Sequence, residues 1–371
     1  MKKNKNYFCC SNIKQIFLIS LFFSVILISC QSKGSNMNKT SFVFNQKCAV
    51  DLHLHLDGSI SVKSARELAE IEGISLPKSD EELENLLSVG DDCRDLNEYL
   101  EKFALPVSLL QSEKSLEKCA YNICKELLEE GFIYAEIRFA PQLHLKKGLT
   151  QKQVVESVLR GVRNSGFKAN VILCAMRSGE DNSYENLETV SLVKEFLNKG
   201  VCALDLAGAE ALFPNEKYSY LFERAREYNV PFTIHSGEAL GAESVEKALE
   251  FGAKRIGHGV RSIESEKTLK ILKEKQIPLE LCPTSNLNTN IFKDYGDFPL
   301  EKLIASGITV TVNSDNMTVS KTNARKEMQH LIESHNLSKE QVKKLLLNSV
   351  DASFLSKEEK KELKKNVEAC F

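Results

Sequence analysis

Eight short apolar runs recur along the chain, and helical patterns separate them. Most runs are almost continuously apolar, which is typical of parallel strands buried on both faces. Eight such strands alternating with helices predict a (β/α)8 TIM-type barrel. The runs cover residues 48–54, 132–139, 169–175, 201–206, 231–235, 254–257, 277–281 and 307–312.

The longest connection lies between the first two strands. It holds several segments with helical spacing, so we expect a helical insertion near the barrel mouth rather than an unstructured loop. Further helices are expected after Val319, and the lysine- and glutamate-rich residues 357–369 fit a solvated helical face better than a binding patch. The expected helices are 61–73, 80–88, 95–110, 113–130, 184–199, 216–229, 242–252, 265–276 and 357–369.

Composition excludes some classes of protein. With 371 residues and 42% hydrophobic content, the chain can bury a large core, and one barrel with insertions accounts for its length. A formal net charge of −2 provides no basic surface for nucleic acid, so we expect no nucleic-acid partner, and we expect a monomer. Cys124, Cys174, Cys202 and Cys282 fall in apolar segments and fit buried free thiols, although the sequence does not settle whether disulfides form.

The first thirty residues have the pattern of an export signal. A lysine-rich start precedes the apolar run 16–28, and Leu27-Ile28-Ser29-Cys30 resembles a bacterial lipobox. We therefore expect a signal peptide over 1–29, lipidation of Cys30, a linker over 30–44 and the barrel over 45–371. An uncleaved membrane anchor is the alternative; in both cases the protein is exported and tethered to a membrane of the cell envelope.

Histidine and acidic residues gather at predicted strand ends. His53 and His55 alternate on the first strand, so both side chains point to one face, although a solvated strand face is as compatible with this pair alone. His235 closes the fifth strand, and Glu238 follows three residues later. A metal-binding histidine with a nearby proton donor fits this motif, and a capping Ser236 with Glu238 as a first-turn acid is the alternative.

Two later predicted strands also end at a histidine or an acidic residue. His258 lies between two glycines after the sixth strand, where it suits acid–base chemistry or is simply a turn residue. Asp315 follows the eighth strand and fits either a metal ligand or a helix N-cap. A parallel barrel brings the carboxyl ends of its strands to one rim, and imidazole and carboxylate together suit a zinc-class ion. We therefore expect a metal-dependent enzyme.

These motifs resemble those of the adenosine deaminase family of metal-dependent hydrolases. The resemblance runs from about Cys48 to about Leu347, and residues 95–103 are similar to the helical lid of that family. The motifs that carry it are Asp51-Leu52-His53-Leu54-His55-Leu56-Asp57-Gly58-Ser59, Asp205-Leu206-Ala207-Gly208, His235-Ser236-Gly237-Glu238, Arg255-Ile256-Gly257-His258-Gly259 and Leu281-Cys282-Pro283-Thr284-Ser285-Asn286.

The resemblance implies a role for each site residue. One Zn²⁺ would be held by His53, His55, His235 and Asp315. Glu238 would protonate purine N1, and His258 with Asp315 would orient the attacking water and help to deprotonate it. Substrate contacts are expected from His55, from Gly208 through its backbone toward N3, from Asp57 to the ribose 5′-hydroxyl, and from Asn316.

Asn316 departs from the family pattern. Many members have a second aspartate after the metal-binding one, where it contacts purine N7, whereas this chain has asparagine. The amide can still donate or accept a hydrogen bond. The departure therefore concerns purine selectivity and leaves the predicted metal site intact.

The predicted reaction is zinc-dependent hydrolytic deamination of adenosine or 2′-deoxyadenosine to inosine or 2′-deoxyinosine and ammonia. Related barrels act on adenine, aminofutalosine or an N6-methylated adenine nucleotide, but a carboxylate at Asp57 favours a neutral 5′-hydroxyl over a phosphate. A nucleoside-binding lipoprotein without activity is the alternative from another class. The complete set of expected ligands, together with Glu238 and His258, argues against it.

Overall fold

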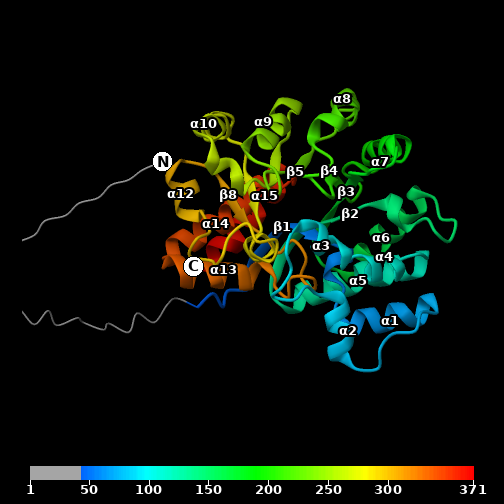
Figure 1. Ribbon diagram of the computed structural model, residues 1–371. Coiled ribbons are helices and arrows are strands. Elements are labelled where there is room, and N and C mark those ends of the chain that lie inside the picture. Colours follow the sequence, from blue (N-terminus) through cyan, green and yellow to red (C-terminus); the bar gives the residue numbers. More distant parts are fainter. Residues whose placement is uncertain (1–42) are drawn as a thin grey trace, which may run out of the picture. The chain divides into compact units, whose positions relative to one another are not determined.

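Eight parallel strands form the centre of the computed structural model, which describes residues 43–371 (Figure 1). They pair in chain order as two four-stranded sheets, β1 to β4 and β5 to β8. Single parallel bridges, Leu204 with Phe232 and Leu54 with Asp315, connect the sheet edges and close the ring. The strands are β1 (Ala49–His55), β2 (Phe132–Phe139), β3 (Ala169–Met176), β4 (Val201–Ala207), β5 (Thr233–Ser236), β6 (Arg255–His258), β7 (Leu279–Leu281) and β8 (Val310–Val312).

The predicted barrel is confirmed, and each predicted strand has a counterpart. The largest displacement is at the eighth strand, which was predicted from residue 307 and begins at Val310. Helices surround the strands in Figure 1 and follow them in alternation. These are α5 (Glu113–Glu129), α6 (Gln151–Ser165), α7 (Ser183–Phe196), α8 (Ser219–Glu227), α9 (Ala242–Phe251) and α10 (Glu266–Lys275).

Helix α6 is absent from the sequence-based expectations. Thr150 and Gln153 form a reciprocal cap at its start, and Gly166 ends it with a φ of +73°. Its buried face is rich in valine, a β-branched residue of lower helix propensity, which weakens the signal in the sequence. Packing of that apolar face decides the conformation.

The insertion after β1 is helical, as predicted, but one of its helices is divided. The 3-10 helix η1 (Asp57–Ser59) is followed by α1 (Val62–Glu72), α2 (Asp80–Leu87), α3 (Leu96–Glu101) and α4 (Ala104–Ser108). The single helix predicted over 95–110 is therefore wrong. Pro106 cannot donate to the carbonyl of Lys102 and its ring crowds that carbonyl, so the helix breaks between α3 and α4.

Further helices follow β7 and β8. Those after β8 agree with the helices expected after Val319, whereas the two between β7 and β8 were not expected. They are α11 (Pro283–Asn288), α12 (Leu300–Ala305), α13 (Ala324–His335), α14 (Lys339–Ala352) and α15 (Lys357–Ala369), and short 3-10 helices η2 (Pro141–His144), η3 (Asn215–Tyr218) and η4 (Val260–Glu264) lie in the loops. The described residues 43–371 lie within one compact unit. The eight cysteines within 43–371 are free thiols, and seven of them are buried.

No helix in this described part is long and apolar enough to span a membrane. The signal peptide and Cys30 lie outside the described residues.

Candidate metal centre and active site

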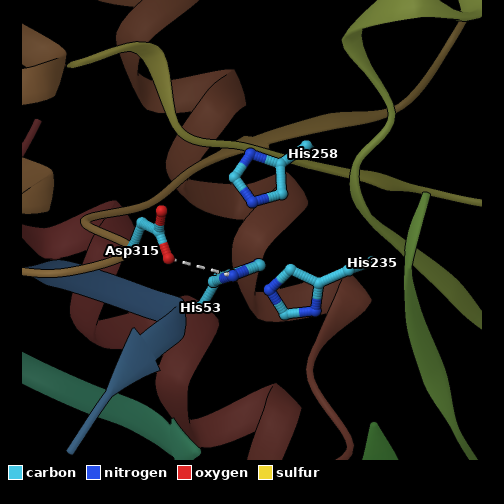
Figure 2. Close-up of side chains that lie close together, drawn as sticks. All are labelled: His53, His235, His258 and Asp315. Carbon is cyan, nitrogen blue, oxygen red and sulfur yellow. Dashed lines mark ion pairs between the residues drawn. The ribbon is translucent and has the colours of Figure 1, made fainter. Parts of the chain in front are cut away.

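Four side chains converge at the carboxyl ends of the strands. His53 comes from β1, His235 from β5 and His258 from β6, and Asp315 follows β8 (Figure 2). One nitrogen or oxygen atom from each lies within 4.8 Å of those of the others, and all four residues are buried. Such a set of imidazole and carboxylate groups suits a divalent cation of the zinc class.

His55 borders the same space. Its Nε2 atom lies 3.3 Å from Nε2 of His235 and 3.4 Å from Oδ1 of Asp315. Nε2 of His53 is also 3.4 Å from that carboxylate oxygen. The structure thus brings together the four ligands expected from the sequence, which are His53, His55, His235 and Asp315. His258, which was not expected to bind the metal, lies in the same cluster.

One atom of this cluster tests whether a metal ion fits. Nε2 of His53 is buried, and although Oδ1 of Asp315 lies 3.4 Å away, it makes no hydrogen bond in the described part of the chain. A buried polar atom without a partner costs about 1–3 kcal/mol, and native proteins rarely tolerate it without a reason. A cation coordinated by this nitrogen removes that cost, so the residues present fit a metal ion.

Carboxylates behind the histidines set the direction of the rings. Nδ1 of His53 lies 2.8 Å from Glu280, and Nδ1 of His235 lies 3.0 Å from Asp205. When Nδ1 carries the proton and donates to a carboxylate, Nε2 keeps its lone pair for a metal. Both Nε2 atoms accordingly point into the cluster.

Arg138 joins the two carboxylates beneath the cluster. Its guanidinium contacts Asp205 at 2.9 Å and Glu280 at 2.8 Å, and all three side chains are fully buried. Arg255 adds contacts to Glu280 at 2.5 Å and to Glu136 at 2.6 Å. Burial alone would raise the pKa of Glu280, but the charges of Arg138 and Arg255 hold it well below its usual range. The sequence contains a signal for this network, since these charged residues interrupt otherwise apolar strands.

A cavity of about 270 Å³ opens above the cluster. Of the residues predicted for the metal and substrate site, all except His53 line this cavity. Leu96, Tyr99, Leu100 and Phe103 of the α3–α4 segment cover it, which agrees with the lid resemblance. The predicted residues on its wall are His55, Asp57, Gly208, His235, Glu238, His258, Asp315 and Asn316.

Glu238 lies in the loop between β5 and α9 and reaches the cavity. Helix α9 begins at Ala242 with Gly241 as its N-cap, and Ser236 belongs to β5, so the capping alternative does not hold. Burial and the charge of Asp315 raise the pKa of Glu238 well above its usual value. A raised pKa favours the protonated form of Glu238, which is the form that a proton donor requires.

His258 and Asp315 share an unusual backbone conformation. Their φ angles are +57° and +60°, in the left-handed region that residues other than glycine rarely adopt. Such strain is found at functional sites, where the surrounding structure enforces it. Nδ1 of His258 lies 3.2 Å from the amide nitrogen of Asn286, and Nε2 of the same ring lies 3.6 Å from Oε1 of Glu238. Burial lowers the pKa of His258 to about 3, so its ring is neutral.

Asp57 and Asn316 both line the cavity, and Gly58, which follows Asp57 in the chain, packs against the Asn316 side chain. A β-carbon at Gly58 would lie only 1.8 Å from Oδ1 of Asn316, so glycine is required there. That oxygen is buried without a hydrogen-bond partner among the described residues, which leaves it open to a donor on a ligand. Burial raises the pKa of Asp57 to about 6.

Known proteins are similar to this chain in sequence and in fold. The adenosine deaminase family matches over residues 48–370. The chain belongs to the adenosine deaminase family. An adenosine deaminase of Haemophilus ducreyi is 48% identical over 298 residues, covering 78% of this chain and 86% of the relative. One from Clostridium botulinum is 41% identical over 301 residues, covering 80% of this chain and 90% of the relative.

Solved structures agree on the fold. An adenine deaminase from Arthrobacter aurescens has a TM-score of 0.77 at 27% identity and covers 87% of this chain and 98% of its own. The N6-methyl-AMP deaminase of Arabidopsis thaliana has a TM-score of 0.74 at 23% identity and covers 87% of this chain and 97% of its own. At this identity, the similarity supports the barrel fold and nothing more specific. Family and barrel were both predicted from the sequence, and both are confirmed. The adenosine deaminase family is metal-dependent, in keeping with the histidine and aspartate cluster.

Proposed function

We propose that this member of the adenosine deaminase family hydrolyses adenosine and 2′-deoxyadenosine to inosine and 2′-deoxyinosine with release of ammonia. The observation that carries the proposal is a buried carboxyl group, Glu238, with its pKa raised, on the wall of a cavity that also exposes the metal-binding cluster. Relatives named adenosine deaminase, at 37% to 48% identity, support the same reaction.

The metal would be Zn²⁺, held by His53, His55, His235 and Asp315. When bound, such an ion acts as a Lewis acid and lowers the pKa of a water molecule from about 16 to about 7. The protein contributes the orientation of its ligands through Glu280 and Asp205, and a cavity with an apolar cover that limits access of bulk water.

The side chains then divide the proton transfers. Glu238 protonates purine N1, which makes C6 electrophilic. His258 and Asp315 would orient the water and take up its proton as its oxygen attacks C6. That proton would then pass to the C6 amino group, which departs as ammonia, and the proton of the new C6 hydroxyl would return to Glu238 as the carbonyl of inosine forms. Water and adenosine together thus give inosine and ammonia.

Asp57 would select a nucleoside with a free 5′-hydroxyl. Its carboxylate can accept a hydrogen bond from that hydroxyl but would repel a 5′-phosphate. The Arthrobacter structure makes adenine the second candidate substrate, because that relative is an adenine deaminase at 27% identity. Adenine lacks the ribose and would leave Asp57 unpaired, at a cost of about 1–3 kcal/mol.

The test is a panel of adenosine, deoxyadenosine, adenine and AMP on purified metal-loaded protein, with ammonia release as the measurement. We expect the nucleosides to give the highest kcat/KM. In Asp57→Ala, kcat/KM for adenosine should fall, so that it comes closer to kcat/KM for adenine. A higher kcat/KM for AMP or adenine would reject the nucleoside assignment, and no ammonia from any of the four would favour the binding protein without activity.

The same protein would be an exported lipoprotein anchored through Cys30. The support is the apolar run 16–28 followed by Leu27-Ile28-Ser29-Cys30. Mass spectrometry of the membrane fraction should find an acylated Cys30 at the mature N-terminus, and Cys30→Ala should abolish that species. A mature protein with an unmodified Cys30, or with residues 1–29 retained, would contradict the proposal.

A further inference from the structure

Glu210 lies in the loop after β4 and contacts the loop that carries Glu238. Its side chain is fully buried. Ser244 donates its hydroxyl to Oε1 at 2.5 Å. Four consecutive backbone N–H groups donate to the same carboxylate, that of Gly237 to Oε1 at 2.8 Å and those of Glu238, Ala239 and Leu240 to Oε2 at 3.1, 2.7 and 3.0 Å.

Successive backbone N–H groups that face one side form a concavity for an anion. Here the chain supplies that anion itself. The loop lies between β5 and α9, so its N–H groups need partners outside a regular element. Gly237 adopts a φ of +68°, and a β-carbon there would lie 2.5 Å from Val245, so the turn depends on glycine as well as on the carboxylate.

The chemistry of the partners explains why the residue is a carboxylate. All five groups that face Glu210 are donors, four N–H groups and one hydroxyl. Ionised glutamate only accepts hydrogen bonds, whereas glutamine would present an NH₂ group to some of these donors. Hydrogen bonds to a charged acceptor are also about twice as strong as neutral ones.

A second connection supports the same two loops. Asn215 donates to Ser236 at 2.9 Å and to the backbone oxygen of Ser244 at 2.9 Å. Arg177 donates to the amide oxygen of Asn215 and to the carbonyl of His235, both at 2.7 Å. The β4 and β5 loops are therefore held together by a buried polar network that reaches the strand of a candidate metal ligand.

We propose that Glu210 is a positioning residue, which fixes the loop of Glu238 against the loop of Gly208. In the proposed reaction, on which this inference rests for its substrate, Glu238 faces purine N1 and the backbone of Gly208 faces N3. N1 and N3 lie on either side of C2 in one ring, so both groups must keep one spacing. Glu210 sets that spacing without touching the substrate.

The first experiment compares Glu210→Gln with wild type in the metal-loaded enzyme. We expect kcat for adenosine to fall on the order of 10²-fold, because small misplacements of a catalytic group have effects of that size. Metal content should be unchanged, and hydrogen exchange of the amides of residues 237–240 should accelerate at least tenfold while the barrel strands stay protected. Glu72→Gln is the control, since Glu72 is buried, accepts hydrogen bonds from the N–H of Gln111 and the hydroxyl of Ser112, pairs with Lys147, and does not line the cavity.

Ser244→Ala is the milder variant, and it keeps the proposal testable if Glu210→Gln does not fold. It removes one hydrogen bond, so kcat should fall about twofold to tenfold with metal content unchanged. Hydrogen exchange of the wild-type protein also tests the proposal, because the backbone amides of residues 237–240 should exchange more slowly than those of exposed loops. Rapid exchange of these amides in wild type, or a Glu210→Gln enzyme with the kcat of the Glu72→Gln control, would overturn the assignment. Wild type without adenosine turnover would reject the proposed function instead, and the exchange measurement would still decide whether Glu210 holds the loop.

Discussion

The floor and the cover of the cavity are built differently. The floor is the metal-binding cluster at the carboxyl ends of the strands. There, His53 and His235 belong to barrel strands, and Nδ1 of each pairs with a buried carboxylate that also contacts Arg138. The cover consists of α3 and the start of α4. It is attached by the contact of Tyr99 with Ser320 at 2.7 Å and by a small apolar cluster separate from the main core, formed by Val89, Cys93, Tyr99 and Val319.

The difference separates two tasks. Groups that bind a metal or transfer a proton must be held within a fraction of an ångström, and a buried ionic network on strands provides that. A segment with few buried contacts costs little free energy to displace, so we expect the cover to move when substrate enters. Substitutions on the floor should therefore affect metal content, chemistry and folding, whereas those on the cover should affect substrate binding.

The largest effect is expected for His53→Ala and His235→Ala. Each removes a nitrogen from the cluster, so the purified protein should lose its metal ion. A Lewis acid contributes several kcal/mol to the transition state, so kcat/KM should fall on the order of 10⁴-fold or more. Elemental analysis with an activity assay measures both. Full metal occupancy in both variants would show that these histidines are not ligands.

Glu238→Gln tests the chemistry of the floor with the metal in place. Glutamine keeps the size of the side chain but cannot deliver a proton to N1, so kcat should fall about 10²–10⁴-fold with metal content unchanged. The raised pKa of Glu238 gives a second signature in the wild type. Activity should be present while Glu238 is protonated and be lost as the pH rises through its pKa, and the variant should lack this alkaline decline. Near-normal turnover would remove Glu238 from the mechanism.

Arg138→Met tests whether the ionic network stabilises the fold. The substitution removes the guanidinium that pairs with both Asp205 and Glu280, while both carboxylates stay buried. Because buried charges that lose a partner are costly, the free energy of unfolding should fall by about 3–5 kcal/mol. The control is Arg224→Met, which breaks an exposed pair with Glu227 and should cost about 0–1 kcal/mol. Urea unfolding measures both. Equal losses in the two variants would contradict the special role of the buried network.

The sequence predicted the floor better than its surroundings. Strand ends could be located because apolar parallel strands are short and continuous, and the motifs at His53, His235, His258 and Asp315 stand at those ends. The network behind them was missed because its members come from separate strands, so only the closed barrel brings Arg138 to Asp205 and Glu280. On the cover, the effect of Pro106 was missed because the apolar spacing continues through the break. Glu210 gave no signal at all, since its partners are backbone groups.

The smallest effect is expected from the cover itself, at Phe103. This side chain lines the cavity, and its ring centroid lies 6.4 Å from that of His55, so it contributes apolar surface above the metal cluster. Burying a whole phenylalanine is worth about 1.5–3 kcal/mol, and Phe103 is only partly buried, so Phe103→Ala should raise KM for adenosine about fivefold to tenfold. Metal content and the pH profile of kcat should stay those of wild type, because no group of the floor changes. Leu86→Ala on α2, where the side chain is 49% exposed and outside the cavity, is the control and should leave KM unchanged. A Phe103→Ala enzyme that lost metal or most of its kcat would show that the cover also organises the floor, and the division between the two regions would then fail.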